Sequence, residues 1–144
     1  RTHRQPCAVR RQPSQMASIF TKIINGEIPC HKIAESAQFF AFLDINPQTK
    51  GHTLVIPKKE VDYIFDVEED VLAGMLPFAK KVAVAIKKVV PCERVGVVVA
   101  GLEVPHAHIH LVPMNEMKDL NWQNGLKMET EELAKLAEAI RAHF

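Results

Sequence analysis

Apolar and polar residues recur with two different periods along this chain, and each period predicts a different kind of element. Alternation with a period of two, or a short apolar run, predicts strands at residues 32–35, 39–44, 52–57, 95–100 and 107–113. Spacings of three and four residues predict helices at residues 18–24, 66–90 and 129–143. Strands and helices do not alternate regularly, and the sequence has no glycine-rich phosphate loop of the common types. The pattern therefore predicts an α+β fold in which about five hairpin-connected strands form an antiparallel sheet.

The two longer helices are expected to pack on this sheet through apolar stripes. In the first, Asp66 is expected to cap the helix and Glu69 to complete a capping box, while Pro77 predicts a kink or a later start. The stripe of this helix is expected to consist of Leu72, Met75, Leu76, Ala79, Val82, Ala83, Ile86 and Val90. In the C-terminal helix the residues expected to point inward are Leu133, Leu136, Ala137 and Ile140. Residues 95–100 contain no polar side chain and are expected to form a buried strand.

Composition and charge narrow the class of protein. Hydrophobic residues make up 47% and charged residues 24% of the 144 residues, which suits one folded domain, expected at residues 16–144. Residues 1–15 are interpreted as a disordered basic extension of engineered or upstream origin, with an organellar transit segment as the alternative. The net charge of +1 becomes −3 without the four arginines of residues 1–16, which argues against a broad nucleic-acid-binding face.

The cysteines and the apolar runs bear on the compartment. Cys7, Cys30 and Cys92 are far apart and form no Cys-x-x-Cys pair, which predicts free thiols in a reducing compartment. No apolar run reaches transmembrane length, and the first residues lack the apolar stretch of a secretory signal. We therefore expect a cytoplasmic protein with no membrane partner.

Three histidines alternate with apolar residues in the segment 104–113. In a strand, side chains at every second position share a face, so His106, His108 and His110 would form a row with α-carbons about 6.5–7 Å apart. The residues expected to enter the core from the other face are Ala107, Ile109 and Leu111. A row of imidazolium ions would repel itself, so some of the rings should be neutral near pH 7.

Three interpretations of this row are open. The imidazoles could bind zinc, although further ligands from elsewhere in the chain are normally needed. A neutral imidazole could instead attack phosphorus or a carbonyl carbon, while its neighbours donate hydrogen bonds to the developing charge. The third interpretation, a polar strand face without chemistry, is the weakest, because it leaves three alternating histidines unexplained.

Several segments resemble the histidine-triad (HIT) nucleotide-binding family. Residues 106–112, His-Ala-His-Ile-His-Leu-Val, are similar to the family signature, in which three histidines alternate with apolar residues. Residues 18–29 (SIFTKIINGEIP) are similar to the family's opening segment. Residues 42–48 (FLDINPQ) and 51–59 (GHTLVIPKK) are similar to its central block. The similarity extends over residues 18–113 in the family's order, and the branch it resembles most is that of the nucleoside phosphoramidate hydrolases.

The resemblance implies a fold, an assembly and a reaction. The fold would be a five-stranded antiparallel sheet with two main helices, extended to ten strands in a homodimer. The reaction would be the hydrolysis of nucleoside 5′-monophosphoramidates, purine nucleotides among them, or of related nucleotide conjugates. In this reaction His108 would attack the α-phosphorus and form a nucleotidyl-histidine intermediate, which water then hydrolyses. The alternative is a non-catalytic nucleotide-binding or scaffold protein.

The resemblance also implies roles for the residues around His108. His110 would donate to a phosphate oxygen, and the backbone carbonyl group of His106 would fix the tautomer of His108. His52 would lie near the leaving group, and Asp44 would accept hydrogen bonds from the ribose hydroxyl groups. The apolar slot for the base would consist of Ile19, Phe20, Ile23, Phe42, Leu43 and Ile45. For all six residues packing in the core is the alternative, and it applies most to Ile23 and Ile45.

Near the expected phosphate the chain departs from the family pattern. Val95 stands where an amide side chain is common, Leu102 where glutamine is common, and Glu103, also expected to bind the nucleotide, where serine or threonine is common. Gly101 is retained and would let the backbone approach the phosphate closely. Phosphate binding would then be weaker, or would depend more on backbone N–H groups.

A structural zinc site, present in some bacterial relatives, is not expected. Those relatives bind zinc with a Cys-x-x-Cys pair near the start and a histidine after the Pro-Lys segment. This chain has Ser18, Thr21 and Glu60 at the matching positions. We therefore expect no metal and no cofactor.

Overall fold

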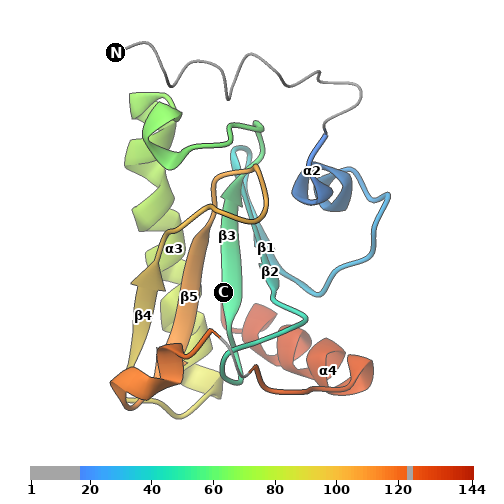
Figure 1. The fold of residues 1–144 in the computed structure, drawn as a ribbon. Coiled ribbons are helices and arrows are strands. Elements are labelled where there is room, and N and C mark those ends of the chain that lie inside the picture. The colour runs from blue at the N-terminus through green and yellow to red at the C-terminus, as the bar shows by residue number, and fades with distance from the viewer. Residues whose placement is uncertain (1–16, 123–124) are drawn as a thin grey trace.

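The computed structural model describes residues 17–122 and 125–144, which form an antiparallel sheet flanked by helices (Figure 1). Its strands are β1 (Lys32–Glu35), β2 (Phe39–Leu43), β3 (Thr53–Pro57), β4 (Arg94–Val98) and β5 (Ile109–Met114), in the order β1-β2-β3-β5-β4. Its helices are α2 (Ile19–Ile24), α3 (Glu69–Val89) and α4 (Thr130–Arg141), with 3-10 turns η1 (Ile64–Asp66) and η2 (Met117–Leu120). The predicted α+β fold with a five-stranded antiparallel sheet is confirmed. The extension expected at residues 1–15 lies outside the described residues.

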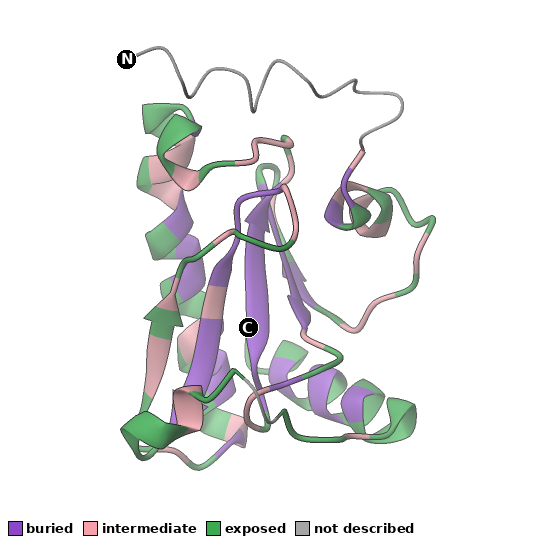
Figure 2. Cartoon of the chain, viewed as in Figure 1, coloured by how far each residue is buried: buried purple, intermediate pink, exposed green. Residues whose placement is uncertain are grey.

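The sheet is covered on both faces, and β2 shows how its sequence produces this arrangement. All five residues of β2 are buried, and their side chains alternate between two apolar clusters. Phe39, Ala41 and Leu43 pack with α3 and α4, whereas Phe40 and Phe42 pack with Phe20 of α2. In Figure 2 the strands β2, β3 and β5 are accordingly purple over most of their length. The main core lies on the α3 face, and the smaller cluster supports α2 on the other.

The start of α3 differs from the prediction. Asp66 does not cap this helix, because it ends the turn η1, and the buried Val67 then takes an extended conformation. The helix therefore begins at Glu69, with Glu68 as its N-cap residue. Pro77 still lies inside α3, on its exposed side, where water can reach the carbonyl group that the missing N–H leaves unpaired.

The buried stripe of α3 was predicted only in part. Val90 and the buried α3 residues Met75, Ala79, Val82 and Ile86 confirm it. The side chain of Leu76, however, is 58% exposed, and the stripe includes Phe78 and Ala85, which were not predicted. A helix has 3.6 residues per turn, so Leu76 lies about 100° from Met75 and falls at the margin of the covered face.

The strand predicted as buried at residues 95–100 is the exposed edge strand β4. It pairs only with β5, and the side chains of Val97 and Val99 are 52% and 41% exposed. An apolar run predicts burial on both faces of a strand only where other elements cover both faces, and α3 reaches only part of this edge. The prediction of a buried strand was therefore wrong.

The histidine-bearing strand is shorter than predicted. β5 begins at Ile109, so of the three alternating histidines only His110 lies in it. Pairing with β3 begins at Ile109, and the N–H group of Ala107 donates instead to the carbonyl group of Val61 (2.7 Å). The side chains of Ala107, Ile109 and Leu111 are nonetheless buried, as predicted.

The helix α4 agrees closely with its prediction. Glu129 and Glu132 form a reciprocal capping box at its start. Its buried residues are Leu133, Leu136, Ala137 and Ile140, as predicted. Of the helices in the described part of the chain, none is long and apolar enough to cross a membrane.

Candidate active site

The three histidines of segment 106–110 lie side by side on the face of the sheet that carries α2. His106 and His108 are buried, with exposed fractions of 0% and 5%, and His110 is half-buried. The ring centroids of His108 and His110 are 4.8 Å apart. The ring of Phe20 contacts those of His106 and His108 edge to face, at 5.8 and 5.1 Å. The row of imidazoles expected from the alternation is therefore present, although most of it precedes the strand.

A backbone contact decides which nitrogen of His108 carries the proton. Its Nδ1 atom lies 2.7 Å from the carbonyl oxygen of His106. A carbonyl oxygen can only accept, so Nδ1 must be protonated and donate. In the neutral ring the Nε2 atom then carries a lone pair, which is the requirement for a nucleophile.

The ring of His106 is held at both nitrogens. Its Nε2 atom lies 2.7 Å from the carbonyl oxygen of Pro57, and its Nδ1 atom lies 2.8 Å from the hydroxyl oxygen of Ser18. Because the carbonyl group needs a donor, Nε2 carries the proton and Nδ1 accepts from Ser18. This neutral, fully bonded ring is a structural support for the backbone carbonyl group that holds His108.

His52 and His110 form a second chain of hydrogen bonds. The backbone N–H of Gln48 donates to Nδ1 of His52 (2.9 Å), so the proton of neutral His52 is on Nε2. That atom donates to Nδ1 of His110 (3.0 Å), which leaves Nε2 of neutral His110 protonated. Each bond runs in one direction, and the last N–H of the chain belongs to a ring that contacts His108.

Burial keeps both rings of this chain neutral near pH 7. Desolvation, with a smaller effect of His110 and His108, lowers the pKa of His52 to about 3. Desolvation, followed by the effect of His108, lowers the pKa of His110 to about 4. His110 can therefore donate a hydrogen bond to an anionic phosphate oxygen without first losing or gaining a proton.

Asp44 follows β2 and lies next to this chain. Its Oδ1 atom accepts from the backbone N–H of Asn46 (2.8 Å), and its Oδ2 atom is 3.7 Å from Nε2 of His52. Burial raises the pKa of the Asp44 carboxyl group, opposed by the Asn46 bond, and the charge of Glu103 raises it further. The exposed Glu103 is thus close enough to Asp44 for its charge to affect the pKa of that carboxyl group.

The residues expected to line the base slot do not all share one face. Phe20 and Phe42 are buried together, with ring centroids 5.5 Å apart, and Ile23 packs against their cluster. Ile19 and Ile45 are 48% and 63% exposed and are available to a ligand. The side chain of Leu43 instead packs in the main core on the α3 face. It cannot line the same slot as Phe42, because adjacent strand residues point to opposite faces.

The three residues that depart from the family pattern, Val95, Leu102 and Glu103, do not lie together in the structure. Val95 packs against the main core and lines a groove on the α3 face, so its side chain cannot reach the histidines. The expectation that valine at this position weakens phosphate binding is therefore wrong. Leu102 is 93% exposed and Glu103 is exposed, both in the loop before His106. Gly101 has a φ of +80°, and no atom lies within 4 Å of the position that a Cβ atom would occupy, so the space beside it is open.

Trp122 was missed by the sequence reasoning. Its half-exposed ring lies 5.0 Å from the ring of His110 and 5.9 Å from that of His52, both edge to face. It borders the site at His110 and His52, whereas Phe20 contacts the rings of His106 and His108. The only available signal was that it is the single tryptophan of the chain, placed shortly after the histidine strand.

One group of side chains has the donor atoms and the spacing of a possible metal site. It consists of Asp44, His52 and His110, and one ligand atom of each lies within 4.8 Å of the others. The hydrogen bonds argue against this use. A neutral imidazole that binds a metal through Nε2 must carry its proton on Nδ1. In His52 that position faces the N–H of Gln48, so the two hydrogens would collide. The donor set does not fit a metal ion.

Together the sheet and the site define a class of α+β protein that presents a buried imidazole with its lone pair on Nε2 beside neutral hydrogen-bond donors. The model of the HIT domain family matches residues 25–117, and the chain belongs to this family.

Relatives and solved structures agree with this assignment. An adenosine 5′-monophosphoramidase of Schizosaccharomyces pombe is 39% identical over 133 residues, which cover 87% of this chain and 96% of the relative. The crystal structure of a HIT-like protein from Bartonella henselae, involved in cell-cycle regulation, has a TM-score of 0.78 at 34% identity and covers 89% of this chain and 96% of its own. A zinc-bound histidine triad family protein from Mycobacterium smegmatis has a TM-score of 0.76 at 27% identity, covering 89% of this chain and 93% of its own.

Proposed function

We propose that this chain is a nucleotide hydrolase that cleaves nucleoside 5′-monophosphoramidates, or related nucleotide conjugates, at the α-phosphorus. The observation that carries the proposal is the 2.7 Å bond from Nδ1 of His108 to the carbonyl oxygen of His106, which directs a lone pair on Nε2 away from the backbone. Relatives named adenosine 5′-monophosphoramidase support the substrate class.

The reaction takes two displacements. In the first, the lone pair of His108 Nε2 forms a bond to the α-phosphorus, and the P–N bond of the substrate breaks with its electron pair on the departing nitrogen, which takes up a proton from solvent and leaves as the free amine. In the second, water attacks the phosphorus of the nucleotidyl-histidine, and the bond from phosphorus to His108 breaks with its electron pair on Nε2. The nucleoside monophosphate is released, and the proton lost by the water returns to solvent. The neutral N–H of His110 is placed to stabilise the charge on phosphate oxygens in both steps.

Trapping the intermediate tests the assignment of the nucleophile. With adenosine 5′-phosphoramidate labelled at phosphorus, rapid quench of the wild-type protein should yield an acid-labile, base-stable phosphohistidine. His108→Ala should lose the label and nearly all turnover but retain nucleotide binding. His110→Ala should retain label and some turnover, since loss of one charge-stabilising donor costs about 10²–10³ in rate. Label on His106 or His110, or on the His108→Ala protein, would refute the assignment.

The alternatives make different predictions in the same assay. A nucleotide-binding or scaffold protein would bind the substrate without turning it over. A metal-dependent hydrolase would lose activity on addition of a chelator. We propose a metal-free enzyme, because Gln48 holds His52 in the wrong tautomer for a metal. Stoichiometric zinc in protein purified without a metal column would contradict this.

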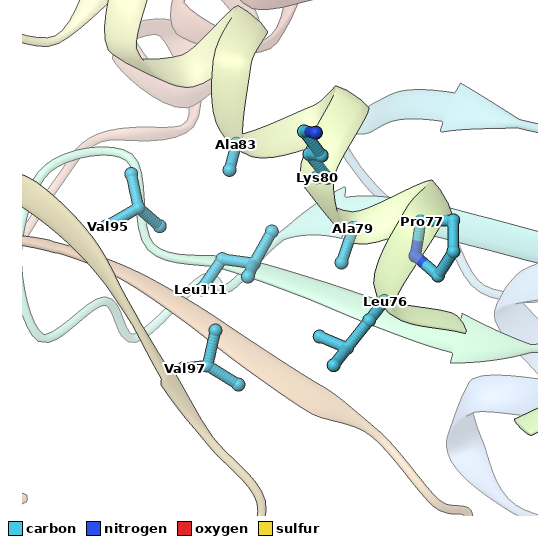
Figure 3. Close-up of a pocket in the computed structure, with 8 residues that line it drawn as sticks. All are labelled: Leu76, Pro77, Ala79, Lys80, Ala83, Val95, Val97 and Leu111. Atoms are coloured by element: carbon cyan, nitrogen blue, oxygen red, sulfur yellow. The ribbon is translucent and has the colours of Figure 1, made fainter. Parts of the chain in front are cut away.

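We also propose that the protein is a homodimer joined along β4. A groove of about 500 Å³ lies between α3 and β4, where Leu76 and Ala79 face Val97 and Leu111 (Figure 3). Its apolar margin continues in a second hollow lined by Phe65 and Val99 among others. Exposed apolar side chains beside an edge strand favour a protein partner, and a second β4 would extend the sheet to ten strands.

We also propose that residues 16–144 form a single domain and that the protein is cytoplasmic. The fold of residues 16–144 as one domain is supported by the common sheet that the described strands share. A cytoplasmic location is supported by the free thiols of Cys30 and Cys92.

A further inference from the structure

A hydrogen-bonded cluster beside Nδ1 of His106 contributes no reacting atom to the two displacements proposed for His108. One oxygen of Glu60, Oε1, accepts from the backbone N–H of Ser18 (2.8 Å) and from the hydroxyl group of Thr21 (2.6 Å). The hydroxyl oxygen of Ser18 caps α2 by accepting from the N–H of Thr21 (3.0 Å) and contacts Nδ1 of His106 (2.8 Å). The cluster thus joins the loop after β3, the start of α2 and the histidine segment.

The protons of this cluster can be assigned one by one. His106 donates from Nε2 to Pro57, so its Nδ1 atom requires a donor. Ser18 has a single hydroxyl proton, and it donates this proton in a hydrogen bond to Nδ1 of His106. Thr21 also lies 3.4 Å from Nδ1 of His106, but its much shorter contact with the carboxylate directs its proton to Glu60. Glu60 therefore keeps Thr21 from competing with Ser18 for His106.

The same carboxylate sets the position of α2. This helix has only six residues, too few to be stable without tertiary contacts. Glu60 binds its N-cap residue and its first turn, and charge-assisted bonds of this kind are stronger than neutral ones. Phe20, which directly precedes Thr21 in the chain, then lies against the rings of both His106 and His108.

We propose that Glu60 is a positioning residue for the hydrolysis: through Thr21 and Ser18 it fixes the ring of His106, and thereby the carbonyl group that holds His108 in its nucleophilic tautomer. This inference rests on the proposed function for its kinetic consequence. The structural part, a single tautomer of His108 that depends on Glu60, stands without it. Glu60 itself touches neither the substrate nor the reacting atoms.

The test compares Glu60→Ala, Glu60→Gln and Thr21→Val with the wild type, with Glu35→Gln as the matched control. Glu35 is likewise a carboxylate with two partners, Lys32 and Lys58, but it lies at the end of β1 and outside the site. With adenosine 5′-phosphoramidate, the single-turnover rate of nucleotidyl-enzyme formation should fall about 10- to 100-fold in Glu60→Ala. This is the range found when a residue that orients a metal-binding side chain from behind is replaced. It should fall less in Glu60→Gln, which keeps an acceptor. KM should change little, and Glu35→Gln should match the wild type.

Nitrogen-15 NMR of the imidazoles supplies a readout that a merely structural role would not change. In the wild type, His108 should show one protonated Nδ1 and one unprotonated Nε2; in Glu60→Ala the two tautomers should exchange. A normal rate in folded Glu60→Ala, or a slow rate with the tautomer of His108 unchanged, would overturn the proposal. If Glu60→Ala does not fold, Glu60→Gln and Thr21→Val decide by the same criteria. If the wild type lacks turnover, the proposed function fails, while the NMR result still decides the role of Glu60.

Discussion

At the scale of single residues, the site depends on which nitrogen of each imidazole carries a proton. In the wild-type fold three backbone groups make this choice: the carbonyl groups of His106 and Pro57 require donors, and the N–H of Gln48 requires an acceptor. Backbone groups cannot change their role when pH changes. The tautomers of His106, His108 and His52 are therefore built into the fold.

The buried imidazoles should make stability depend on pH. The pKa values of His52 and His110 are about 3 and 4 in the folded protein, against an ordinary value of 6.5. Between about pH 4 and 6.5 both histidines bind protons in the unfolded chain but stay neutral in the folded protein. The free energy of unfolding is therefore greatest above this pH range and decreases as the pH falls through it. Urea denaturation should give a lower free energy of unfolding at pH 5 than at pH 7.

A variant isolates this contribution from that of other groups. His52→Asn keeps an acceptor for the N–H of Gln48 but cannot titrate, so the difference between pH 7 and pH 5 should shrink. The exposed His143→Asn should leave the difference as in the wild type. An unchanged pH dependence in His52→Asn would show that the ring of His52 is not a buried, neutral group.

Asp44 should act in binding more than in chemistry. If its carboxylate accepts the ribose hydroxyl groups, Asp44→Ala should weaken nucleotide affinity by about 1.5–3 kcal/mol for each bond lost. The rate of nucleotidyl transfer at saturating substrate should change much less. Calorimetry with a nucleotide and its 2′,3′-dideoxy analogue gives the test, and equal affinity for the two ligands would rule out the contact.

At the scale of elements, the loop between β2 and β3 must turn sharply while it packs against two other elements. Gly51 lies there with a φ of +95°, and a methyl group added to it would be 3.1 Å from side-chain atoms of both Pro113 and Val90. Glycine is thus required by backbone conformation and by space together. The turn at Gly51 leads directly into His52 and then into β3.

Gly51→Ala should therefore destabilise the protein more than a matched change elsewhere. Gly26 has a similar φ of +82° but nothing within 4 Å of the added methyl group. Gly26→Ala should cost only the backbone strain, about 1–2 kcal/mol, and Gly51→Ala should cost more because Pro113 and Val90 must also shift. Equal losses of Tm would show that the contacts at Gly51 relax freely.

At the scale of the whole molecule, the two faces of the sheet have separate tasks. One carries the histidines, Asp44 and α2, and the other is covered by α3 and α4. The apolar groove lies on the second face, beside β4, and thus away from the histidines. This separation allows the proposed dimer to form without covering the site.

The proposed dimer should be sensitive to charge on β4. Val97→Lys places an ammonium group where the side chain is 52% exposed beside the groove, and it should convert a dimer into a monomer in sedimentation at micromolar concentration. Leu126→Lys, at an exposed aliphatic residue away from β4, should remain a dimer. A wild-type protein that sediments as a monomer would contradict the proposal.

The sequence alone determined the elements and the residue types of the site, because periodicity and local motifs act over a few residues. The stripe of α4, the alternation of Ala107, Ile109 and Leu111, and the family match through the histidine segment all belong to this level. Sequence patterns failed where an outcome depends on which other element is nearby. Residues 95–100 were predicted to be buried, and Leu76 to point inward, because no local pattern shows where the cover of α3 ends.

Only the tertiary structure decided how the site works. Trp122 reaches His110, and Glu60 reaches His106 through Ser18 and Thr21, across separations in the sequence that carry no periodic signal. In the sequence, Ser18, Thr21 and Glu60 stand in place of the zinc ligands of some relatives; the structure shows that they bond to one another instead. The tautomer of His108, on which its chemistry rests, is set by the backbone carbonyl group of His106. Every residue type has such a group, so the residue types alone do not indicate it; the resemblance to the family suggested this contact, and the structure shows it.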